Sequence, residues 1–488
     1  MSQTTQGRVT LDTTTATADA PGRPAKKPSL FKNHDYALLF SGGLVSITGD
    51  MLFNTTLTVW IATQLAWKQS WAPLAVSGVL LAAALPTFLI GPFAGVFVDR
   101  AEKRRMMMWM DALRAVVVAL MLLISGDIAL PFLPDSKPPV FWTLGVIYAV
   151  VFVINAAQQF FAPASIALIV PIVSEEQQPQ AMGFSQMSYA IAAIIGPAIA
   201  APLFVAFGAF WALLFNAVSF AVSFLCISAI RTKGAPVARS EGQTASFWRE
   251  FAEGVRFYFT NRVLLTLTVC IIVAVAGASA LNTLDVFFTT QNLGASTAVY
   301  GLVGAVYGLG AVVGSIVLGA FAERVGLARV LWLSLALMGA LIAIVSRMTA
   351  VGPALGLMCA IGFFNAGLNV AVAPLFMRST PSTLLGRIMS IFQPIQNLVI
   401  LLGTALVGYL ASVTLSGFHT TWLGMRFGPV DTIWGAGGAL IALSAIVVVI
   451  GLWGVDRKTR EARRAEAPQA AMAQNGEATA MAAQLSGE

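Results

Sequence analysis

Charged side chains are scarce in this chain. Only 10% of its 488 residues are Asp, Glu, Lys or Arg, whereas soluble domains carry about 25%. No such residue occurs between Glu176 and Arg231, between Asp285 and Glu323, or between Arg387 and Arg426. Stretches of this length cannot form a water-exposed surface, and each exceeds the roughly 20 apolar residues that cross a bilayer. A soluble fold is therefore excluded.

Histidine and cysteine are almost absent too. The two histidines are His34 and His419, and the three cysteines are Cys226, Cys270 and Cys359. They show no metal-ligand spacing, so we expect no metal and no cofactor, and we expect the cysteines to be small core residues of helices. The chain also lacks a GxxxxGK[ST] sequence, so we do not expect it to drive its own work by nucleotide hydrolysis.

What the chain has in abundance is apolar sequence, 57% of its residues. Division at Gly, Pro and charge clusters predicts an all-α membrane protein with twelve transmembrane helices. Their predicted positions are 37–62, 74–98, 106–126, 141–163, 181–206, 210–230, 263–288, 298–322, 328–346, 351–377, 387–411 and 432–455. The short connections at 206–210 and 346–351 make the count least certain there.

The basic residues predict the orientation. With the N-terminus inside, 24 of the 29 lysines and arginines fall in inside segments and four in outside loops, while Arg114 lies within a helix. Cytoplasmic segments of membrane proteins carry this excess. We therefore expect both termini in the cytoplasm and need no nucleic-acid partner to explain the net charge of +7.

The two halves of the chain repeat. "FNTTL" (53–57) matches "LNTLD" (281–285), "GVFVDR" (95–100) matches "GAFAER" (319–324), and "INAAQQ" (154–159) matches "FNAGLN" (364–369). The offsets are 228, 224 and 210 residues, and each match falls in corresponding helices. The pattern predicts two pseudo-symmetric six-helix bundles, an architecture of transporters with the site between the halves.

The predicted domains follow from this repeat. They are a disordered cytoplasmic tail (1–32), an N-terminal six-helix bundle (33–230), a cytoplasmic linker (231–262), a C-terminal six-helix bundle (263–456) and a cytoplasmic tail (457–488). The linker contains the amphipathic stretch "SFWREFAEGVRFYF". This stretch fits a helix on the membrane surface and equally a helix packed against a bundle.

One motif carries a family resemblance. "GPFAGVFVDRAEKRR" (91–105) resembles the loop motif between the second and third helices of the major facilitator superfamily, in which a glycine precedes an aspartate–arginine pair and further basic residues. The resemblance implies the major facilitator fold and a gating role for the residues that match, in both copies of the repeat: Gly95, Asp99, Arg100, Arg104, Gly319, Glu323 and Arg324.

A second motif narrows the resemblance. "AIAAIIGPAIAAP" in the fifth span is similar to the family's antiporter motif, with Gly196 and Pro197 retained and small alanines in place of the outer glycines. The fourth span lacks the arginine found in many drug/proton antiporters. "SITGD" in the first span and "TPSTLLGRIMSI" (380–391) resemble the siderophore-exporter and macrolide-type efflux subgroup.

Two acidic residues within spans are candidates for proton coupling. An aspartate at the centre of a helix in a bilayer costs about 2.5–3.5 kcal/mol and marks ion or substrate pathways. Asp50 in the first span is the first candidate, and Asp285 near the outer end of the seventh is the second. Transfer out of water favours the neutral form of a carboxyl group, as a proton carrier requires. A structural acid is the alternative for Asp50, a hydrated acid the alternative for Asp285, and we expect Asp111 and Arg114 to form a local pair.

Amide side chains recur in the helices that line the cavity in the superfamily. They could bind a polar ligand, or they could hold helices together through hydrogen bonds. The candidates for the substrate cavity are Asn54, Asn155, Gln159, Asn282, Asn365, Asn369, Gln393 and Gln396.

These observations predict a secondary active transporter in the cell membrane that exports a bulky amphipathic compound, such as a drug, antibiotic or siderophore, against protons. The expected partners are a small-molecule substrate, protons and the lipid bilayer, and we expect a monomer. An uptake permease or uniporter on the same fold is the alternative. A membrane enzyme is a weaker one, because the two histidines lie outside the predicted cavity and no catalytic residues converge.

Overall fold

The computed structural model describes residues 30–122, 139–232, 255–381, 384–422 and 425–452. The first bundle consists of α1 (His34–Trp60), α2 (Ala72–Leu89), α3 (Gly91–Arg100), α4 (Lys103–Leu122), α5 (Val140–Ile172), α6 (Gln178–Phe207) and α7 (Ala209–Ala229), of which α2 and α3 together form one predicted span. The second consists of α9 (Arg262–Phe287), α10 (Thr297–Val325), α11 (Leu327–Val345), α12 (Val351–Ser379), α13 (Leu385–Tyr409) and α14 (Pro429–Gly451).

The predicted spans agree closely with these helices. Eleven helices among the described residues are long and apolar enough to cross a membrane. The twelfth predicted span is α4, which packs between α5 and α7 but carries three basic residues at its start and both Asp111 and Arg114. Its charge is what separates it from the other eleven.

Proline and glycine explain most departures from regular helices. The second span divides into α2 and α3 at Ile90, just before Gly91 and Pro92. A proline cannot donate the backbone hydrogen bond that would continue the helix. Between α6 and α7 the chain turns at Gly208, whose φ of 80° suits glycine. This turn separates the predicted spans 181–206 and 210–230, one of the two pairs whose short connection made the predicted count least certain.

Three features were not expected. Helix α5 continues through Pro163 and Pro171 to Ile172, nine residues beyond the predicted end. Helices α1, α9 and α13 each end in a π-helical turn, at Ile61–Leu65, Phe288–Asn292 and Leu410–Thr414. The connection between α13 and α14 contains a short antiparallel hairpin of β1 (Thr420–Trp422) and β2 (Met425–Phe427).

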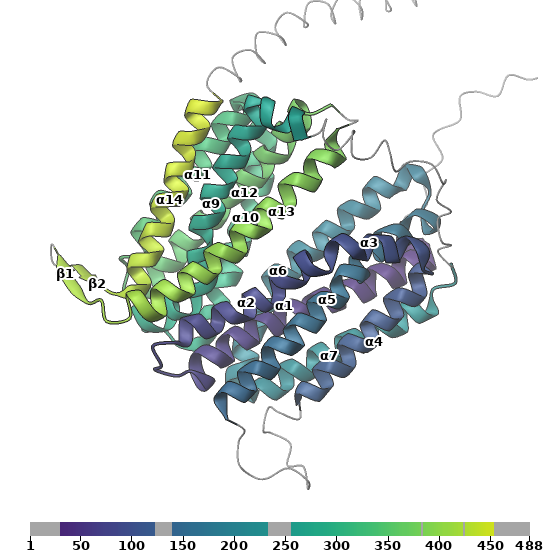
Figure 1. The fold of residues 1–488 in the computed structure, drawn as a ribbon, viewed down its shortest axis with the longest axis horizontal. Coiled ribbons are helices and arrows are strands. Elements are labelled where there is room, and N and C mark those ends of the chain that lie inside the picture. Colours follow the sequence, from purple (N-terminus) through teal and green to yellow (C-terminus); the bar gives the residue numbers. More distant parts are fainter. Residues whose placement is uncertain (1–29, 123–138, 233–254, 382–383, 423–424, 453–488) are drawn as a thin grey trace, which may run out of the picture.

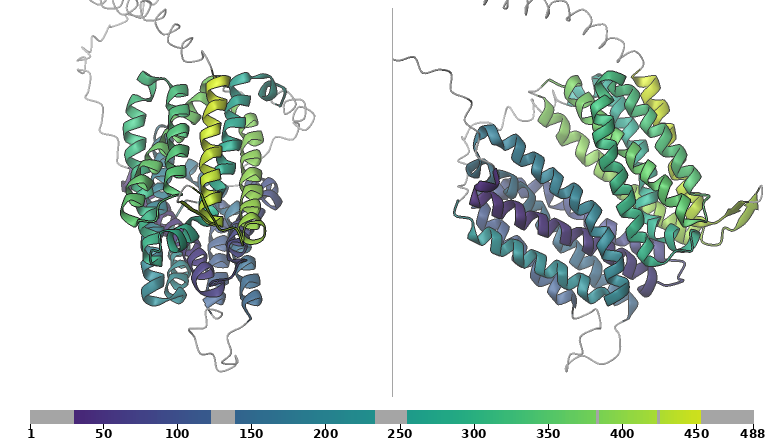
Figure 2. Two further views of the ribbon diagram at one scale, coloured as in Figure 1. Left: turned by 90° about the vertical axis from the view of Figure 1, so that its left-hand side faces the viewer. Right: turned by 180° about the vertical axis from the view of Figure 1, so that it is seen from behind.

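The two bundles meet at one end and diverge at the other (Figure 1). We call the end where α1 begins and α7 ends the wide end, and the end that carries the hairpin the narrow end. The view from behind shows the same divergence (Figure 2).

In the described part of the chain, the most extensive contacts between the bundles are those of α6 with α10 and of α2 with α13, and α2 also contacts α9. Small residues allow the close approach. A Cβ atom added to Gly301 of α10 would lie 2.5 Å from the carbonyl oxygen of Pro197 in α6, and one added to Gly408 of α13 would lie 2.1 Å from Ser77 Oγ of α2. The backbone N–H of Leu74 donates to Ser412 Oγ at 2.9 Å, also between the bundles.

Large apolar side chains cover the outer surface of the bundles, as a lipid environment allows. Exposed aromatic residues lie towards both ends of the bundles, as in the aromatic belts of membrane proteins. They include Trp67, Trp142 and Trp211 towards the narrow end and Phe97, Trp109 and Phe259 towards the wide end.

The predicted tails lie outside the described residues, except for Leu30–Lys32, which form a 3₁₀ turn. Only the end of the predicted amphipathic stretch is described, as a helical turn over 255–260. Its Tyr258 is buried, and the Tyr258 hydroxyl forms a hydrogen bond with Thr268 Oγ1 of α9. At this end, the linker packs against the second bundle.

Candidate transport pathway

A cavity of about 400 Å³ opens between α1, α5 and α6 in the half of the first bundle nearest the wide end. One face of α1 supplies a wall, because residues three, four and seven positions apart share a helix face. Aromatic and aliphatic side chains dominate the lining, with polar groups interspersed. Its members include Tyr36, Phe40, Ile47, Asp50, Gln158, Phe161, Ser165, Gln186 and Tyr189.

Asp50 lies at the deep end of this cavity. Its side chain is half-buried and lines the cavity wall, so the carboxyl group avoids lipid, as the sequence analysis required. The backbone around it is held tightly. A Cβ atom added to Gly49 would lie 2.2 Å from Ser219 Oγ of α7, and one added to Gly196 would lie 2.4 Å from Met51 Cβ.

Asp285 lies in a different environment. It is near the end of α9, and its Oδ1 atom is buried without a hydrogen-bond partner among the described residues. Tyr300 and Tyr307 of α10 lie within electrostatic range of its carboxyl group. In this conformation Asp285 is half-buried near the narrow end.

Three of the eight amide candidates donate side-chain hydrogen bonds in the described contacts: Asn155, Gln159 and Asn369. Asn155 and Asn369 donate to the carbonyl oxygens of Val151 and Asn365 one turn earlier, at 2.9 and 3.1 Å. Gln159 also reaches another helix, with Nε2 3.4 Å from Thr87 Oγ1. The other candidates have no cross-helix bond in the described contacts. Asn54, Asn282, Asn369 and Gln393 are exposed, whereas Asn365 and Gln396 are half-buried.

The two copies of the loop motif both lie at the wide end, one in each bundle. A Cβ atom added to Gly95 or to Gly319 would meet no other atom within 4 Å. Asp99 and Arg100 are exposed. Glu323 instead pairs with Arg378 inside the second bundle, and Arg324 lies 5.9 Å from the ring centroid of Phe321.

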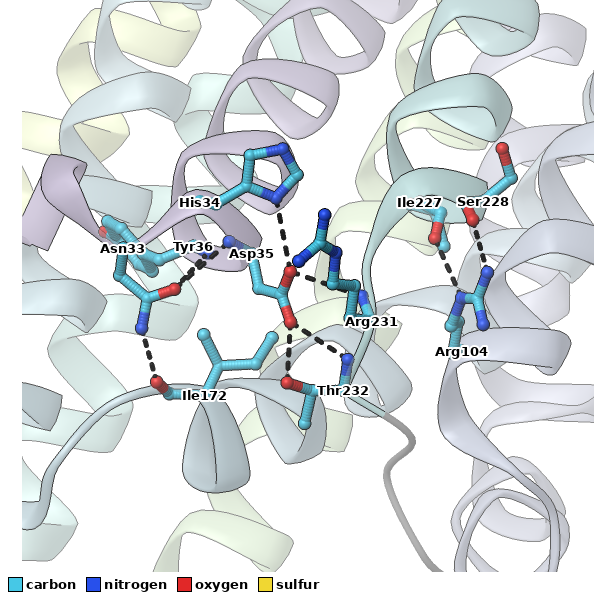
Figure 3. Close-up of polar contacts among 10 residues, drawn as sticks. All are labelled: Asn33, His34, Asp35, Tyr36, Arg104, Ile172, Ile227, Ser228, Arg231 and Thr232. Carbon is cyan, nitrogen blue, oxygen red and sulfur yellow. Dashed lines mark hydrogen bonds and ion pairs between the residues drawn. The ribbon is translucent and has the colours of Figure 1, made fainter.

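Arg104 has a role that the motif did not suggest. Its side chain donates to the carbonyl oxygens of Ile227 and Ser228, which end α7 (Figure 3). Lys103 similarly donates to three carbonyl oxygens around the end of α3. Cations at helix C-termini satisfy unpaired carbonyl groups and oppose the helix dipole. These contacts hold α3, α4 and α7 together at the wide end.

The Gly-Pro motif of the fifth predicted span lies in α6 and allows close packing on two sides of this helix. Gly196 lets α1 approach α6 within the first bundle, and Pro197 contacts Gly301 and Gly304 of α10 in the second. Ala192, Ala200 and Ala201, which replace the outer glycines of the motif, are fully buried. Close packing therefore survives the replacements.

Asn33 and Asn261 form a pair of capping residues that the sequence analysis missed. Asn33 Oδ1 accepts from the backbone N–H groups of Asp35 and Tyr36, and its Nδ2 donates to the Ile172 carbonyl at 2.8 Å (Figure 3). Asn261 Oδ1 accepts from Val263 and Leu264 in the same way, and its Nδ2 donates to the Ser379 carbonyl at 3.0 Å. The signal was available: "FKN" and "FTN" lie 228 residues apart, the offset of the first repeat.

Asp35 extends this anchoring to the end of α7. Its carboxylate accepts from the backbone N–H groups of Arg231 and Thr232 and from the Thr232 hydroxyl, at 3.2, 2.9 and 2.6 Å (Figure 3). The start of α1 is thus tied to the ends of α5 and α7. These bonds make the wide end of the first bundle a connected unit.

Arg114 and Asp111 form the expected pair, deep inside the first bundle. Arg114 also makes a contact that the sequence did not reveal: its Nη1 donates to Gln158 Oε1 of α5 at 2.8 Å. The fourth span lacks its own arginine, and α4 supplies a guanidinium to it from the neighbouring helix.

A second cavity, of about 630 Å³, lies at the narrow end beneath the hairpin. Arg347 is held there by Asp431, with Nη1 3.0 Å from Oδ2, and by the ring of Phe427. His419 lines the same cavity. Because the charged groups are paired and the cavity belongs to the loop surface, it lies apart from the route between the bundles.

The comparisons with known proteins agree with this architecture. The family model described as Major Facilitator Superfamily matches residues 39–294 and 280–483. The uncharacterized MFS-type transporter YkuC of Bacillus subtilis is 26% identical over 249 residues, 49% of this chain and 53% of that protein. The putative bacilysin exporter BacE of the same organism is 30% identical over 39% of this chain and 43% of that protein.

Macrolide efflux protein A of Streptococcus pyogenes is 22% identical over 47% of this chain and 52% of that protein. The chain thus spans about half the length of the curated relatives it matches.

Solved structures share the fold at low identity. A bacterial homologue of the iron transporter ferroportin in an inward-facing state has a TM-score of 0.65 and 15% identity, over 86% of this chain and 98% of that one. A bacterial homolog of the lysosomal transporter Spinster, also inward-facing, has a TM-score of 0.62 and 13% identity, over 86% and 95%. A ferroportin homologue in an outward-facing state scores lower, at 0.54.

Two helical bundles that meet at one end, with a cavity that contains a carboxyl group in the membrane region, define the fold of a multi-span membrane transporter. The chain belongs to the Major Facilitator Superfamily. Members of this family carry small molecules across membranes, and the relatives found here include efflux proteins.

Proposed function

We propose that the chain is a secondary active exporter that expels a bulky amphipathic organic compound in exchange for protons. The observation that carries the proposal is the cavity beside α1, which combines aromatic and aliphatic walls with the carboxyl group of Asp50. The bacilysin and macrolide exporters among the relatives support the direction and the class of substrate.

The wide end is the cytoplasmic end in this proposal, and both termini lie in the cytoplasm of a cell whose membrane holds the protein. The distribution of basic residues supports this orientation. Those of the described residues at the wide end are Lys32, Arg100, Lys103, Arg104, Arg105, Arg231, Arg256, Arg262, Arg324, Arg329, Arg378 and Arg387, against Lys68, Arg347 and Arg426 towards the narrow end. The conformation is then inward-facing.

The cavity suits a compound with a large apolar surface and a few polar groups. Pockets of about 300–1,000 Å³ lined mainly by apolar side chains bind such molecules, and this one has about 400 Å³ within the first bundle alone. The exposed amides Asn54, Asn282 and Asn369 extend the polar surface towards the second bundle, since amides on transmembrane helices face protein or water rather than lipid.

Asp50 is the coupling residue in the proposed mechanism. It receives a proton when the narrow end is open to the outside, and it releases the proton into the cytoplasmic cavity when the wide end opens. The substrate moves in the opposite direction through the same alternation. Asp285 is the second candidate, because it is half-buried near the narrow end, where an outward opening would reach it.

The loop motif acts on the alternation rather than on the substrate. Gly95 and Gly319 face open space in this conformation. When the wide end closes, these glycines would allow helices of the two bundles to approach, and Asp99 would find basic partners or a helix N-terminus. The motif would therefore stabilise the inward-closed form.

The test is transport in proteoliposomes with a radiolabelled macrolide and radiolabelled bacilysin as probes. With an imposed pH gradient, acidic on the side that protons leave, we expect at least one probe to accumulate on the acidic side. Accumulation on the opposite side would identify an uptake symporter. Equilibration without accumulation would identify a uniporter, and no movement of either probe would reject both relatives as guides to the substrate.

A further inference from the structure

A buried charged cluster lies directly behind the wall of the cavity that holds Asp50. The side chains of Arg114 and Asp111 have exposed fractions of 1% and 0%. The Arg114 guanidinium lies between two aromatic rings, with its central carbon 4.4 Å from the ring centroid of Phe161 and 4.6 Å from that of Phe220. Phe161 also lines the cavity, as does Gln158, which accepts the hydrogen bond from Arg114 Nη1. Arg114 is thus one side chain away from the cavity.

Asp50 lies beside this cluster. It lines the same cavity as Phe161 and Gln158, both of which contact the Arg114 guanidinium, and its charge interacts with those of Arg114 and Asp111. The other titratable side chains among the described residues of the cavity wall are Tyr36 and Tyr189. From α7, Ser219 and Asn216 pack against the neighbouring Gly49 and bring no charge. Arg114 is therefore the one cation found near Asp50 in the described part of the chain.

The charges in the cluster do not balance. Two carboxyl groups share one guanidinium, and Asp111 already holds it by a hydrogen bond within α4. The second oxygen of Asp111 is buried and has the Ser223 hydroxyl of α7 as its polar neighbour, so the Asp111 carboxylate depends on Arg114 for a compensating charge. A buried charge without a partner is costly. When the cavity closes, Asp50 must therefore be neutralised by something other than the arginine.

We propose that Asp50, Asp111 and Arg114 form one proton-binding unit, in which Asp111 occupies the arginine and so leaves Asp50 to be neutralised by a proton. Asp111 and Arg114 are positioning residues: they touch neither the substrate nor the proton that is carried. The proposal rests on the proposed role of Asp50 and adds the reason why Asp50 binds a proton rather than an arginine. Strongly coupled groups of this kind titrate as a unit.

The proposal predicts how many carboxyl groups of the cluster become protonated in each variant. When the buffer changes from mildly alkaline to mildly acidic, the parent should gain one protonated carboxyl group in the cluster. Asp111→Asn frees Arg114 to pair with Asp50, so this variant should gain none. Arg114→Gln leaves two carboxyl groups without a cation and should gain two. The double variant Asp111→Asn/Arg114→Gln should gain one again.

Infrared difference spectroscopy of the purified full-length protein measures these changes through the carboxyl C=O band. Other acids contribute equally to all variants and cancel in comparisons with the parent. Asp431→Asn is the matched control, because it also removes the acid of a buried arginine pair but lies at the narrow end, and it should leave the count unchanged. Gln158→Met provides a second route that keeps Asp111: it removes one acceptor of Arg114, and the gain should fall below that of the parent.

A purely structural Asp111–Arg114 pair would give a different result. Asp50 would then gain its proton in Asp111→Asn and in Gln158→Met as it does in the parent, and that outcome overturns the proposal. The proposed function fails separately, if Asp50→Asn still accumulates a transported probe. A parental titration in Asp111→Asn together with a transport defect in Asp50→Asn would reject the unit and leave Asp50 as the coupling residue.

Discussion

Asn33 and Asn261 each connect two helices with one side chain. Each caps the start of one helix, α1 or α9, and donates to a carbonyl group at the end of another, α5 or α12. Their equivalence by the repeat shows that the duplication extends to individual hydrogen bonds. The anchoring at the wide end is thus built twice, once in each bundle.

Replacement of either asparagine should destabilise its bundle. Loss of an N-cap costs about 1 kcal/mol, and the carbonyl group left without its donor raises the total to about 1–3 kcal/mol. We expect Asn33→Ala and Asn261→Ala to lower the thermal unfolding midpoint of the protein in detergent by similar amounts. Asn369→Ala is the control, because Asn369 is exposed and bonds only within its own helix. Equal midpoints for Asn261→Ala and the control would contradict the capping role.

The residue scale also shows where sequence reasoning ended. Asp50 could be identified from its charge within an apolar stretch, and Asp111 and Arg114 from their spacing of three. The link from Arg114 to Gln158 could not, because it depends on how α4 is rotated against α5. The family resemblance directed attention to an arginine in the fourth span, which this chain lacks. The guanidinium that contacts this span comes from Arg114 of α4 instead.

At the scale of helices, the apolar pattern was sufficient for nearly every boundary. Composition determines where a chain can cross a bilayer, so the predicted spans and the observed helices differ mostly by a few residues. The exceptions have local causes. Helix α5 passes through two prolines that the pattern treated as an end, and the hairpin of three-residue strands has too few residues for a period to be recognised.

Contacts between helices decide which conformations the halves can adopt. Gly301 of α10 packs against the backbone of Pro197, which cannot yield as a flexible side chain could. Overpacking at such a point costs about 1–3 kcal/mol. We expect Gly301→Ala to weaken the narrow-end contact and to shift the population by about tenfold towards the form in which the narrow end is open and the wide end is closed.

Distances between spin labels at Ser174→Cys and Val325→Cys would measure this shift. The labels lie at the wide ends of different bundles, and the native Cys226, Cys270 and Cys359 would first be replaced. Gly301→Ala should increase the fraction of short distances. Gly352→Ala, where an added Cβ meets nothing within 4 Å, should leave the distribution as in the parent, and equal behaviour of the two variants would contradict the role of Gly301.

The loop motif should act in the opposite direction. A leucine at position 95 has room in the present conformation but would block the approach of helices when the wide end closes. We expect Gly95→Leu to keep the label distances long, to leave membrane abundance unchanged and to slow transport at least several-fold. Normal transport by Gly95→Leu would limit the motif to its effect on topology.

At the scale of the whole molecule, the first property to test is its orientation in the membrane. The wide end carries most of the basic residues, so it should face the cytoplasm. In intact cells, a membrane-impermeant maleimide should label Gly417→Cys at the narrow end but not Ser174→Cys at the wide end, and disruption of the cells should make both reactive. Both positions are exposed. Labelling of Ser174→Cys in intact cells would reverse the orientation and the direction of transport that follows from it.

The arrangement of the halves was only partly predictable. The internal repeat indicated two bundles and a site between them, because duplicated halves related by a pseudo-two-fold axis form such sites. It could not indicate which end is closed. That depends on small-residue contacts such as Gly301 with Pro197 and Gly408 with Ser77, and a transporter must be able to break and remake these contacts.

The central claim is that Asp50 couples proton movement to export. The most direct measurement is accumulation of a transported probe by Asp50→Asn in proteoliposomes under an imposed pH gradient, with Asp285→Asn in parallel. Asn keeps the size of Asp50 but cannot bind and release a proton. We predict that Asp50→Asn loses accumulation while it still exchanges the probe down its gradient, and that Asp285→Asn keeps at least half of the parental accumulation. Accumulation by Asp50→Asn equal to that of the parent would contradict the claim.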